Sequence, residues 1–163
     1  MFFCNLCFLP ADASERQHKI EAAYLYNFFN YITWPSYASP QALDVPIICI
    51  YGKDPILPYL EYIARKMAGE RSLKIRIINR SDHETAGCHM LFMRHSMSYK
   101  MLKAATNDTL IVIKPDDPLD RGGMIELSEE DNDRIAISIN HNQLEQKGFQ
   151  VSSRLLDLAR KMK

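Results

Sequence analysis

The sequence has 163 residues, of which 47% are hydrophobic and 25% are charged, a composition typical of one globular domain with a sizeable core and not of a disordered chain. Its 20 basic residues balance its 20 acidic residues, so the net charge indicates neither nucleic acid nor an anionic membrane as a partner. No apolar run in the sequence is long enough to cross a membrane as a helix.

The first thirteen residues, MFFCNLCFLPADA, are apolar and end in A-D-A, a pattern typical of a signal-peptide cleavage site. We interpret residues 1–13 as the remnant of a secretory signal peptide and residues 14–163 as the mature domain. The apolar stretch is short and no basic residue precedes it, which a start codon placed too far downstream would explain. The alternative is a hydrophobic N-terminus that is retained, in which Cys4-x-x-Cys7 would be half of a redox or metal motif.

Near-helical spacing of apolar residues predicts a first helix from Ser14 to about Tyr31. The helix should stop before Trp34-Pro35, because proline disfavours helical backbone in the residue before it. The segment is rich in aromatic residues, which fits either a helix buried against a sheet or an aromatic contact surface. We expect Trp34 to stay partly exposed where proline turns the chain.

Short apolar runs predict six strands, and helical patterns separate most of them. The first run is apolar on both faces, so we expect it to be the central strand of a mostly parallel sheet with helices on both faces. The last two strands flank the acidic stretch EEDND and form a C-terminal antiparallel hairpin. The fold class is therefore a single α/β domain. The predicted strands are Val45–Gly52, Ser72–Asn79, His89–Arg94, Thr109–Lys114, Met124–Ser128 and Arg134–Asn140, and the later helices are Asp54–Met67, Ser96–Thr106, Asn142–Lys147 and Ser152–Met162.

The sequence contains no pattern that predicts catalysis. Its five histidines lack metal-ligand spacing, and G-x-S-x-G, phosphate-loop and G-x-G-x-x-G motifs are missing. The acidic stretch lacks the central glycine and terminal glutamate of a calcium loop. We therefore predict no enzymatic activity, no metal and no cofactor.

One candidate binding site follows from the predicted topology. If the first and third strands are neighbours, their C-terminal ends form a crevice of the kind that binds ligands in α/β sheets. Lys53 and Asp54 would line one side of this crevice, and Arg94 and His95 the other. A small anion could bind there, which would make the protein a small-molecule sensor.

A second candidate site is Arg121-Gly122-Gly123-Met124. Adjacent glycines permit backbone angles or a close approach that other residues forbid. The motif either begins a strand, with Arg121 in a salt bridge, or contacts a ligand or partner. In the second case Arg121 can pair with a carboxylate and Met124 can adapt to an apolar surface.

Four segments together resemble the YfiR-like family of secreted regulators (DUF4154): EAAYLYNFFNYITWP, AGCHMLFM, DRGGMIEL followed by EDNDRIAISIN, and VSSRLLDLARK. They occur in the family's order and at similar spacing over nearly the whole mature chain. The resemblance implies a periplasmic protein that binds the periplasmic part of a membrane diguanylate cyclase, lowering cyclic-di-GMP signalling and biofilm formation. An outer-membrane lipoprotein and a second copy of the chain are further candidate partners. The resemblance does not imply an enzyme.

Only Cys49 and Cys88 remain if residues 1–13 are removed, and export would place this pair in an oxidising compartment. The family resemblance places a disulfide at these positions, while the alternative is two buried thiols. Some relatives carry a second cysteine pair in the later part of the domain, and this sequence has none there. The preferred function is an inhibitory binding protein that uses Trp34 and the Arg121–Met124 motif as contacts, and the alternative is the small-molecule sensor.

Overall fold

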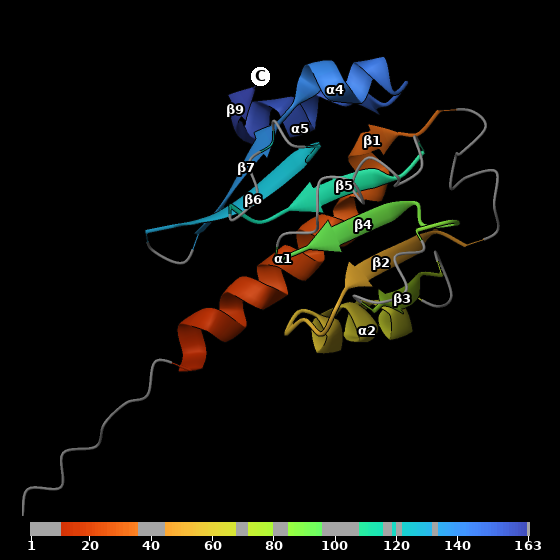
Figure 1. The fold of residues 1–163 in the computed structure, drawn as a ribbon. Coiled ribbons are helices and arrows are strands. Elements are labelled where there is room, and N and C mark those ends of the chain that lie inside the picture. Colours follow the sequence, from red (N-terminus) through yellow and green to blue (C-terminus); the bar gives the residue numbers. More distant parts are fainter. Residues whose placement is uncertain are drawn as a thin grey trace, which may run out of the picture.

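A mostly parallel sheet of seven strands runs through the protein in the order β3-β2-β4-β5-β6-β7-β9 (Figure 1). A separate antiparallel pair joins β1 to β8. Together with four described helices these strands form one mixed α/β domain, as the sequence predicts. The elements are α1 (Ala11–Tyr31), β1 (Ile32–Thr33), β2 (Ile47–Tyr51), α2 (Leu57–Lys66), β3 (Lys74–Ile78), β4 (Met90–Met93), β5 (Leu110–Ile113), β6 (Ile125–Glu130), β7 (Arg134–Ile139), α4 (His141–Gln146), β8 (Gln150–Val151), α5 (Ser153–Leu158) and β9 (Ala159–Met162).

The structure is a computed structural model, and its description covers most of the chain. The helix predicted at Ser96–Thr106 lies outside the described residues. None of the described helices combines the length and the apolar character needed to cross a membrane. The described residues are 11–35, 45–67, 72–79, 85–95, 108–115, 119, 122–131 and 134–162.

Strand β2 is the first strand of the main sheet along the chain, and the sheet extends on both sides of it. It pairs in parallel with β3 on one side and β4 on the other. Ile48, Cys49 and Ile50 are fully buried, which confirms the predicted strand with two apolar faces. The strand is interior but not central, because only β3 lies on one side of it while five strands lie on the other. The expected central position is therefore wrong, and the expected β2–β4 neighbourhood is confirmed.

Helix α1 lies along one face of the sheet and contacts α2 (Figure 1). Ala22, Leu25, Phe28 and Phe29 are buried and join the core. The spacing of these residues places one stripe of the helix against the strands. Helix α1 crosses several strands. Polar residues on the same face as its buried stripe therefore lie above the carboxyl ends of those strands.

The C-terminal part differs from the predicted single helix at Ser152–Met162. Helix α5 begins where the Ser152 side chain accepts a hydrogen bond from the backbone N–H of Leu155, and it ends at Leu158, because the backbone of Ala159 is extended. The following residues form β9, which pairs in parallel with β7. Pairing with the open edge of β7 therefore overrides the helical pattern of the sequence.

Candidate functional site

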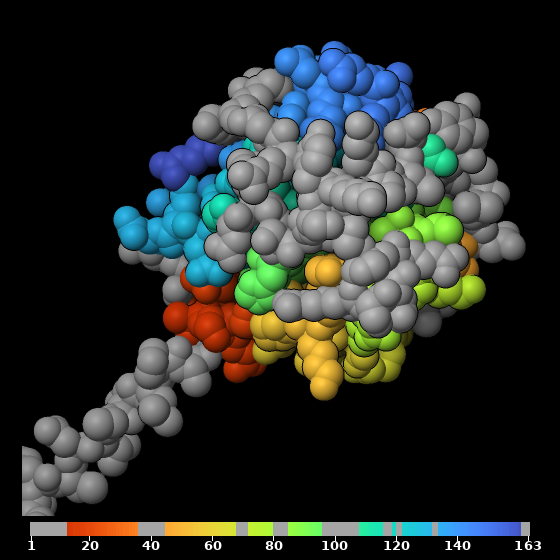
Figure 2. All heavy atoms as spheres, viewed as in Figure 1, coloured from red at the N-terminus to blue at the C-terminus, as the bar shows by residue number. Residues whose placement is uncertain are grey.

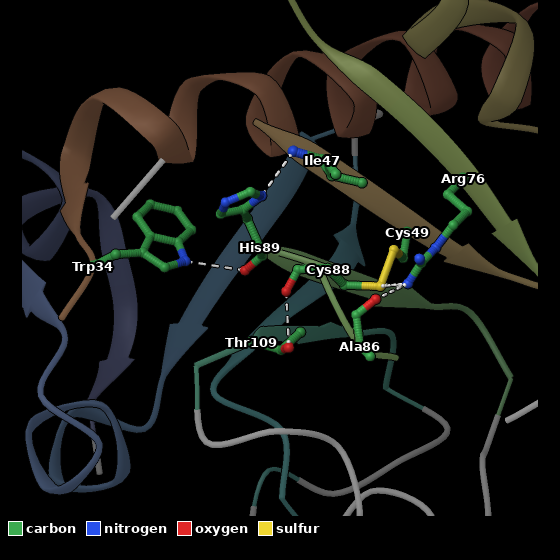
Figure 3. The surroundings of a disulfide bond; sticks show 8 residues. All are labelled: Trp34, Ile47, Cys49, Arg76, Ala86, Cys88, His89 and Thr109. Atoms are coloured by element: carbon green, nitrogen blue, oxygen red, sulfur yellow. Dashed lines mark hydrogen bonds between the residues drawn. A yellow bond between two sulfur atoms is a disulfide. The ribbon is translucent and has the colours of Figure 1, made fainter. Parts of the chain in front are cut away.

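A disulfide joins Cys49 in β2 to Cys88, which lies two residues before β4 (Figure 3). The two Cα atoms are 5.7 Å apart, within the usual range for a disulfide. Both cysteines are buried. The parallel pairing of β2 with β4 brings the two positions together. The pairing implied by the family resemblance is thus present in the structure.

Residues from β3 and from the segment before β5 make polar contacts on the Cys88 side of this disulfide (Figure 3). Arg76 of β3 donates from Nη2 to the carbonyl of Ala86 at 2.6 Å, and the same nitrogen lies 2.9 Å from Sγ of Cys88. The Thr109 hydroxyl, just before β5, donates to the carbonyl of Cys88 at 2.9 Å. These contacts fix the segment before β4 against both β3 and β5.

Trp34 lies inside the core, so its expected exposure is wrong. Its side chain is 2% exposed, and its ring stacks on Phe29 and meets Phe149 edge-on. The indole Nε1 donates to the carbonyl of His89 at 3.0 Å (Figure 3). Because the polar edge of the ring finds this buried acceptor, the whole side chain can be buried. Trp34 therefore offers no surface to a partner in this structure.

The predicted crevice between β2 and β4 brings two of its four expected residues together. Arg94, directly after β4, donates from Nε to Oδ2 of Asp54 at 2.9 Å. Its Nη2 donates to Glu21 of α1 at 2.6 Å. Lys53 and His95 are exposed instead. The guanidinium that was expected to receive an anion from solution is held by carboxylates of the protein.

The same cluster extends to the next two strands. Lys114, directly after β5, donates to Oε1 of Glu21 at 2.6 Å and to Oε1 of Glu129 in β6 at 3.1 Å. Glu21 is fully buried and receives a cation on each oxygen. We call Glu21, Asp54, Arg94, Lys114 and Glu129 the carboxyl-edge network. It links α1 to the ends of β2, β4 and β5 and to β6.

Electrostatics in the carboxyl-edge network favour the charged form of Arg94. Burial by itself lowers the pKa of Arg94, but hydrogen bonds and charge attraction from Glu21 and Asp54 raise it above its ordinary value. Asp54 is also satisfied by the backbone N–H of Ile56, which donates to its Oδ1 at 2.9 Å. Buried charges that are paired and hydrogen-bonded in this way stabilise a defined arrangement. The network therefore acts as a fastening between α1 and the sheet.

Sequence reasoning missed Glu21, although a signal was present. Glu21 precedes the buried Leu25 and Phe28 by four and seven residues, so the three share one helix face. An acid on a buried face requires a cation. Arg94 and Lys114 each stand directly after a buried strand, and parallel strands end at the same edge of a sheet.

The described part of the Arg121–Met124 motif, residues 122–124, leads directly into strand β6. Gly122 has φ = 119°, a conformation that L side chains rarely adopt. Gly123 approaches β5 so closely that a Cβ atom there would lie 2.4 Å from Cδ1 of Ile113. Met124 is fully buried, because it packs in the core as the chain enters the sheet, so its expected role at an exposed contact is wrong. Arg121 lies outside the described residues, and its contact role stays a prediction.

The described residues hold no group of three or more His, Cys, Asp or Glu side chains arranged to bind a metal ion. None of the curated proteins compared with the chain matches it. A family model described as YfiR/HmsC-like matches residues 18–160. This range contains both bonded cysteines and all five members of the carboxyl-edge network. Because the match covers nearly all of the 163 residues, the chain belongs to the YfiR/HmsC-like family.

Proposed function

We propose that this protein is a periplasmic negative regulator that binds the periplasmic part of a membrane-bound diguanylate cyclase. Binding lowers cyclic-di-GMP signalling and with it biofilm formation. The family match over residues 18–160 carries this proposal. The buried Cys49–Cys88 disulfide supports it, because structural disulfides persist in oxidising compartments such as the periplasm.

The proposed mechanism needs no chemistry on the regulator. A partner that binds the inactive conformation of the cyclase more tightly than the active one shifts the population toward the inactive conformation. To shift that equilibrium tenfold at saturation, the regulator must prefer the inactive conformation by roughly tenfold. A rigid surface on a small domain is sufficient for this role.

The second function suggested by the sequence, a small-molecule sensor, has less support. It requires an open cation in the crevice between β2 and β4. Arg94 there is bound by Asp54 and Glu21, and Lys114 is bound by Glu21 and Glu129. A ligand anion would have to displace the buried carboxylates of Glu21 and Asp54, or bind through the exposed Lys53 alone.

The test uses oxidised protein from residue 14 onward and the purified periplasmic part of a membrane diguanylate cyclase from the same genome. We expect direct binding by calorimetry. In cells, deletion of the regulator should raise cyclic-di-GMP, and a cyclase without its periplasmic part should not respond. Failure to recover any membrane diguanylate cyclase in a pull-down, together with unchanged cyclic-di-GMP on deletion, would contradict the proposal.

A further inference from the structure

Helices α1 and α2 enclose a surface groove of about 690 Å³. Its floor is mainly apolar and includes Tyr59, Tyr62 and Ile63 of α2, while Lys19 of α1 and Arg65 of α2 stand at its rim. The volume lies within the range of sites that hold a ligand or a few partner side chains. Figure 2 shows the first turns of α1 (red) and the segment around α2 (yellow) next to each other at the surface.

The groove contains an aromatic side chain that is more than half exposed in the described protein. Tyr62 is 56% exposed, and it is one of three large apolar side chains exposed among the described residues, with Ile77 and Leu158. Tyrosine and arginine are the residue types that most often dominate binding energy at protein interfaces. Tyr59 lies on the same helix and is partly buried against the core, so it can present a fixed edge to a partner.

The charged side chains that line the groove among the described residues are cations, each paired with a carboxylate of its own helix. The described residues that line it include the two cations Lys19 and Arg65 and no carboxylate. Lys19 lies 5.8 Å from the centre of the Tyr59 ring, and Lys66 lies 5.7 Å from that of Tyr62. Cations over ring faces are held near the apolar floor. The groove thus combines an apolar base with a positive rim.

Each rim cation has an exposed carboxylate neighbour on its own helix. Lys19 pairs with Glu15 at 2.8 Å and Arg65 with Glu61 at 3.9 Å, each within one helix and with all four side chains at least half exposed. Exposed pairs of this kind contribute little to stability. A partner's carboxylates can therefore replace them without disturbing the fold.

The part of α1 that borders the groove is held in place by ion pairs to the sheet. Glu21 lies between Lys19 and Ala23 in α1, and its carboxylate is held by Arg94 and Lys114 at the sheet edge. This fastening restrains the turn of α1 that borders the groove. A surface that is ordered before binding loses less conformational entropy on association.

We propose that the α1–α2 groove is the surface on which the periplasmic part of the diguanylate cyclase docks. The occupant is an amphipathic helical segment of that partner. Its apolar side chains cover Tyr59 and Tyr62, and its carboxylates pair with Lys19 and Arg65. A cleft between two helices suits a third helix laid along it, and the positive rim selects acidic flanks. This inference rests on the function proposed above.

Two variants test the surface. Tyr62→Ala removes the aromatic contact, and Lys19→Glu combined with Arg65→Glu reverses the rim charge. We expect each to weaken binding of the purified periplasmic domain at least tenfold, with only a small change in melting temperature, because all three side chains are largely exposed. Wild-type binding should also weaken as salt rises, and the charge-reversed variant should lose or reverse that dependence, because salt screens repulsion as well as attraction.

The matched control is Leu158→Ala, at a 59% exposed apolar position on α5, which should leave affinity unchanged. Suppose that the wild type binds, that the Tyr62 and rim variants bind as well as the wild type, and that the Leu158 variant does not bind. The docking site is then elsewhere on the protein, and the proposed function still stands. If the groove variants alter only self-association, the groove is a contact between copies and the inference is overturned. If the folded wild type does not bind the domain at all, both proposals fail.

Discussion

The imidazole of His89 lies beside the disulfide and accepts the backbone N–H of Ile47 at Nδ1, at 3.0 Å (Figure 3). A ring that accepts at Nδ1 carries its proton on Nε2 and is neutral. Burial lowers the pKa of His89 below its ordinary value. Protonation would place a charge in the core and also remove the acceptor of Ile47.

We therefore predict that His89 makes stability depend on pH. The pKa of His89 is lower in the folded protein than in the unfolded chain. At a pH between these two pKa values the unfolded chain binds more protons than the folded protein, so the stability of the fold rises with pH in that range. Its contribution is complete above about pH 6.5 and is lost as the pH falls below that value. Melting curves from pH 8 to pH 5 should show a steeper loss for the wild type than for His89→Asn, which keeps an acceptor but does not titrate. Equal slopes would show that another group is responsible.

The close approach of Gly123 to β5 leads to a second prediction. A methyl group at Gly123 would collide with the Ile113 side chain, which is 1% exposed and cannot move into solvent. Gly123→Ala should destabilise the protein by about 1–3 kcal/mol, as overpacking usually does. Adding Ile113→Val removes Cδ1 and should recover part of that loss in urea unfolding. Strict additivity of the two variants would contradict the collision.

At the residue scale, the sequence predicted features that follow from the backbone. The two glycines of the 122–123 pair perform the two tasks expected of such residues, one by its positive φ and one by close approach. Trp34 was predicted wrongly because its burial depends on a carbonyl from a distant strand, 55 residues away in sequence. No local pattern contains that information.

Helix α1 is held to the sheet by its apolar stripe and by one acid. Glu21 is fully buried, and the side chains of Arg94 and Lys114 are 15% and 7% exposed. In sequence, Arg94 lies 73 residues and Lys114 lies 93 residues after Glu21. Removing the acid would leave two cations short of a partner in a place from which water is largely excluded.

We predict that Glu21→Ala destabilises the protein by about 3 kcal/mol, the low end for breaking a buried ion pair, because Asp54 and Glu129 still hold the two cations. The control is Glu15→Ala on the same helix, whose partner Lys19 is exposed, and its melting temperature should not change. Chemical unfolding of both variants compares them directly. Equal effects of the two substitutions would show that the network does not hold α1.

At the element scale, the six strands β2 to β7 were predicted, and strands β1, β8 and β9 were not. Apolar runs identify strands such as β4 and β5 because every side chain in them is buried. Strands β1 and β8 have two residues each, too few for a period to be seen. Strand β9 follows a helical pattern in sequence and becomes a strand only through its pairing with β7.

For the molecule as a whole, the disulfide is the main covalent constraint among the described residues. It joins residues 39 apart and encloses α2 and β3 in one loop. Closing a loop of this length stabilises the folded state by about 4 kcal/mol in the chain-entropy model. The contacts of Arg76 and Thr109 depend on the same segment being in place.

The prediction is that Cys88→Ser lowers the free energy of unfolding by about 4 kcal/mol, and that reductant does the same to the wild type. Urea unfolding of protein from residue 14 onward, with and without reductant, measures both. Reductant should leave the Cys49→Ser/Cys88→Ser double variant unaffected. Identical midpoints for oxidised and reduced wild type would contradict a stabilising disulfide.

At this scale the family could be identified from sequence, but the candidate docking surface could not. The family motifs can be read in order along the sequence, whereas the groove forms only where α1 and α2 pack against each other. Tyr62 and Lys19 are 43 residues apart, and neither belongs to a motif. Only their packing places a ring and a cation on one surface.

Strand β3 stands at the edge of the sheet and pairs only with β2 in the described structure. Edge strands fray most easily, and a detached edge can pair with another chain. Because the disulfide closes the loop that contains β3, a frayed strand remains tethered at a high effective concentration near its own site. Rebinding within the molecule then outcompetes capture by a neighbour, so the oxidised protein is protected against strand exchange and aggregation as well as against unfolding.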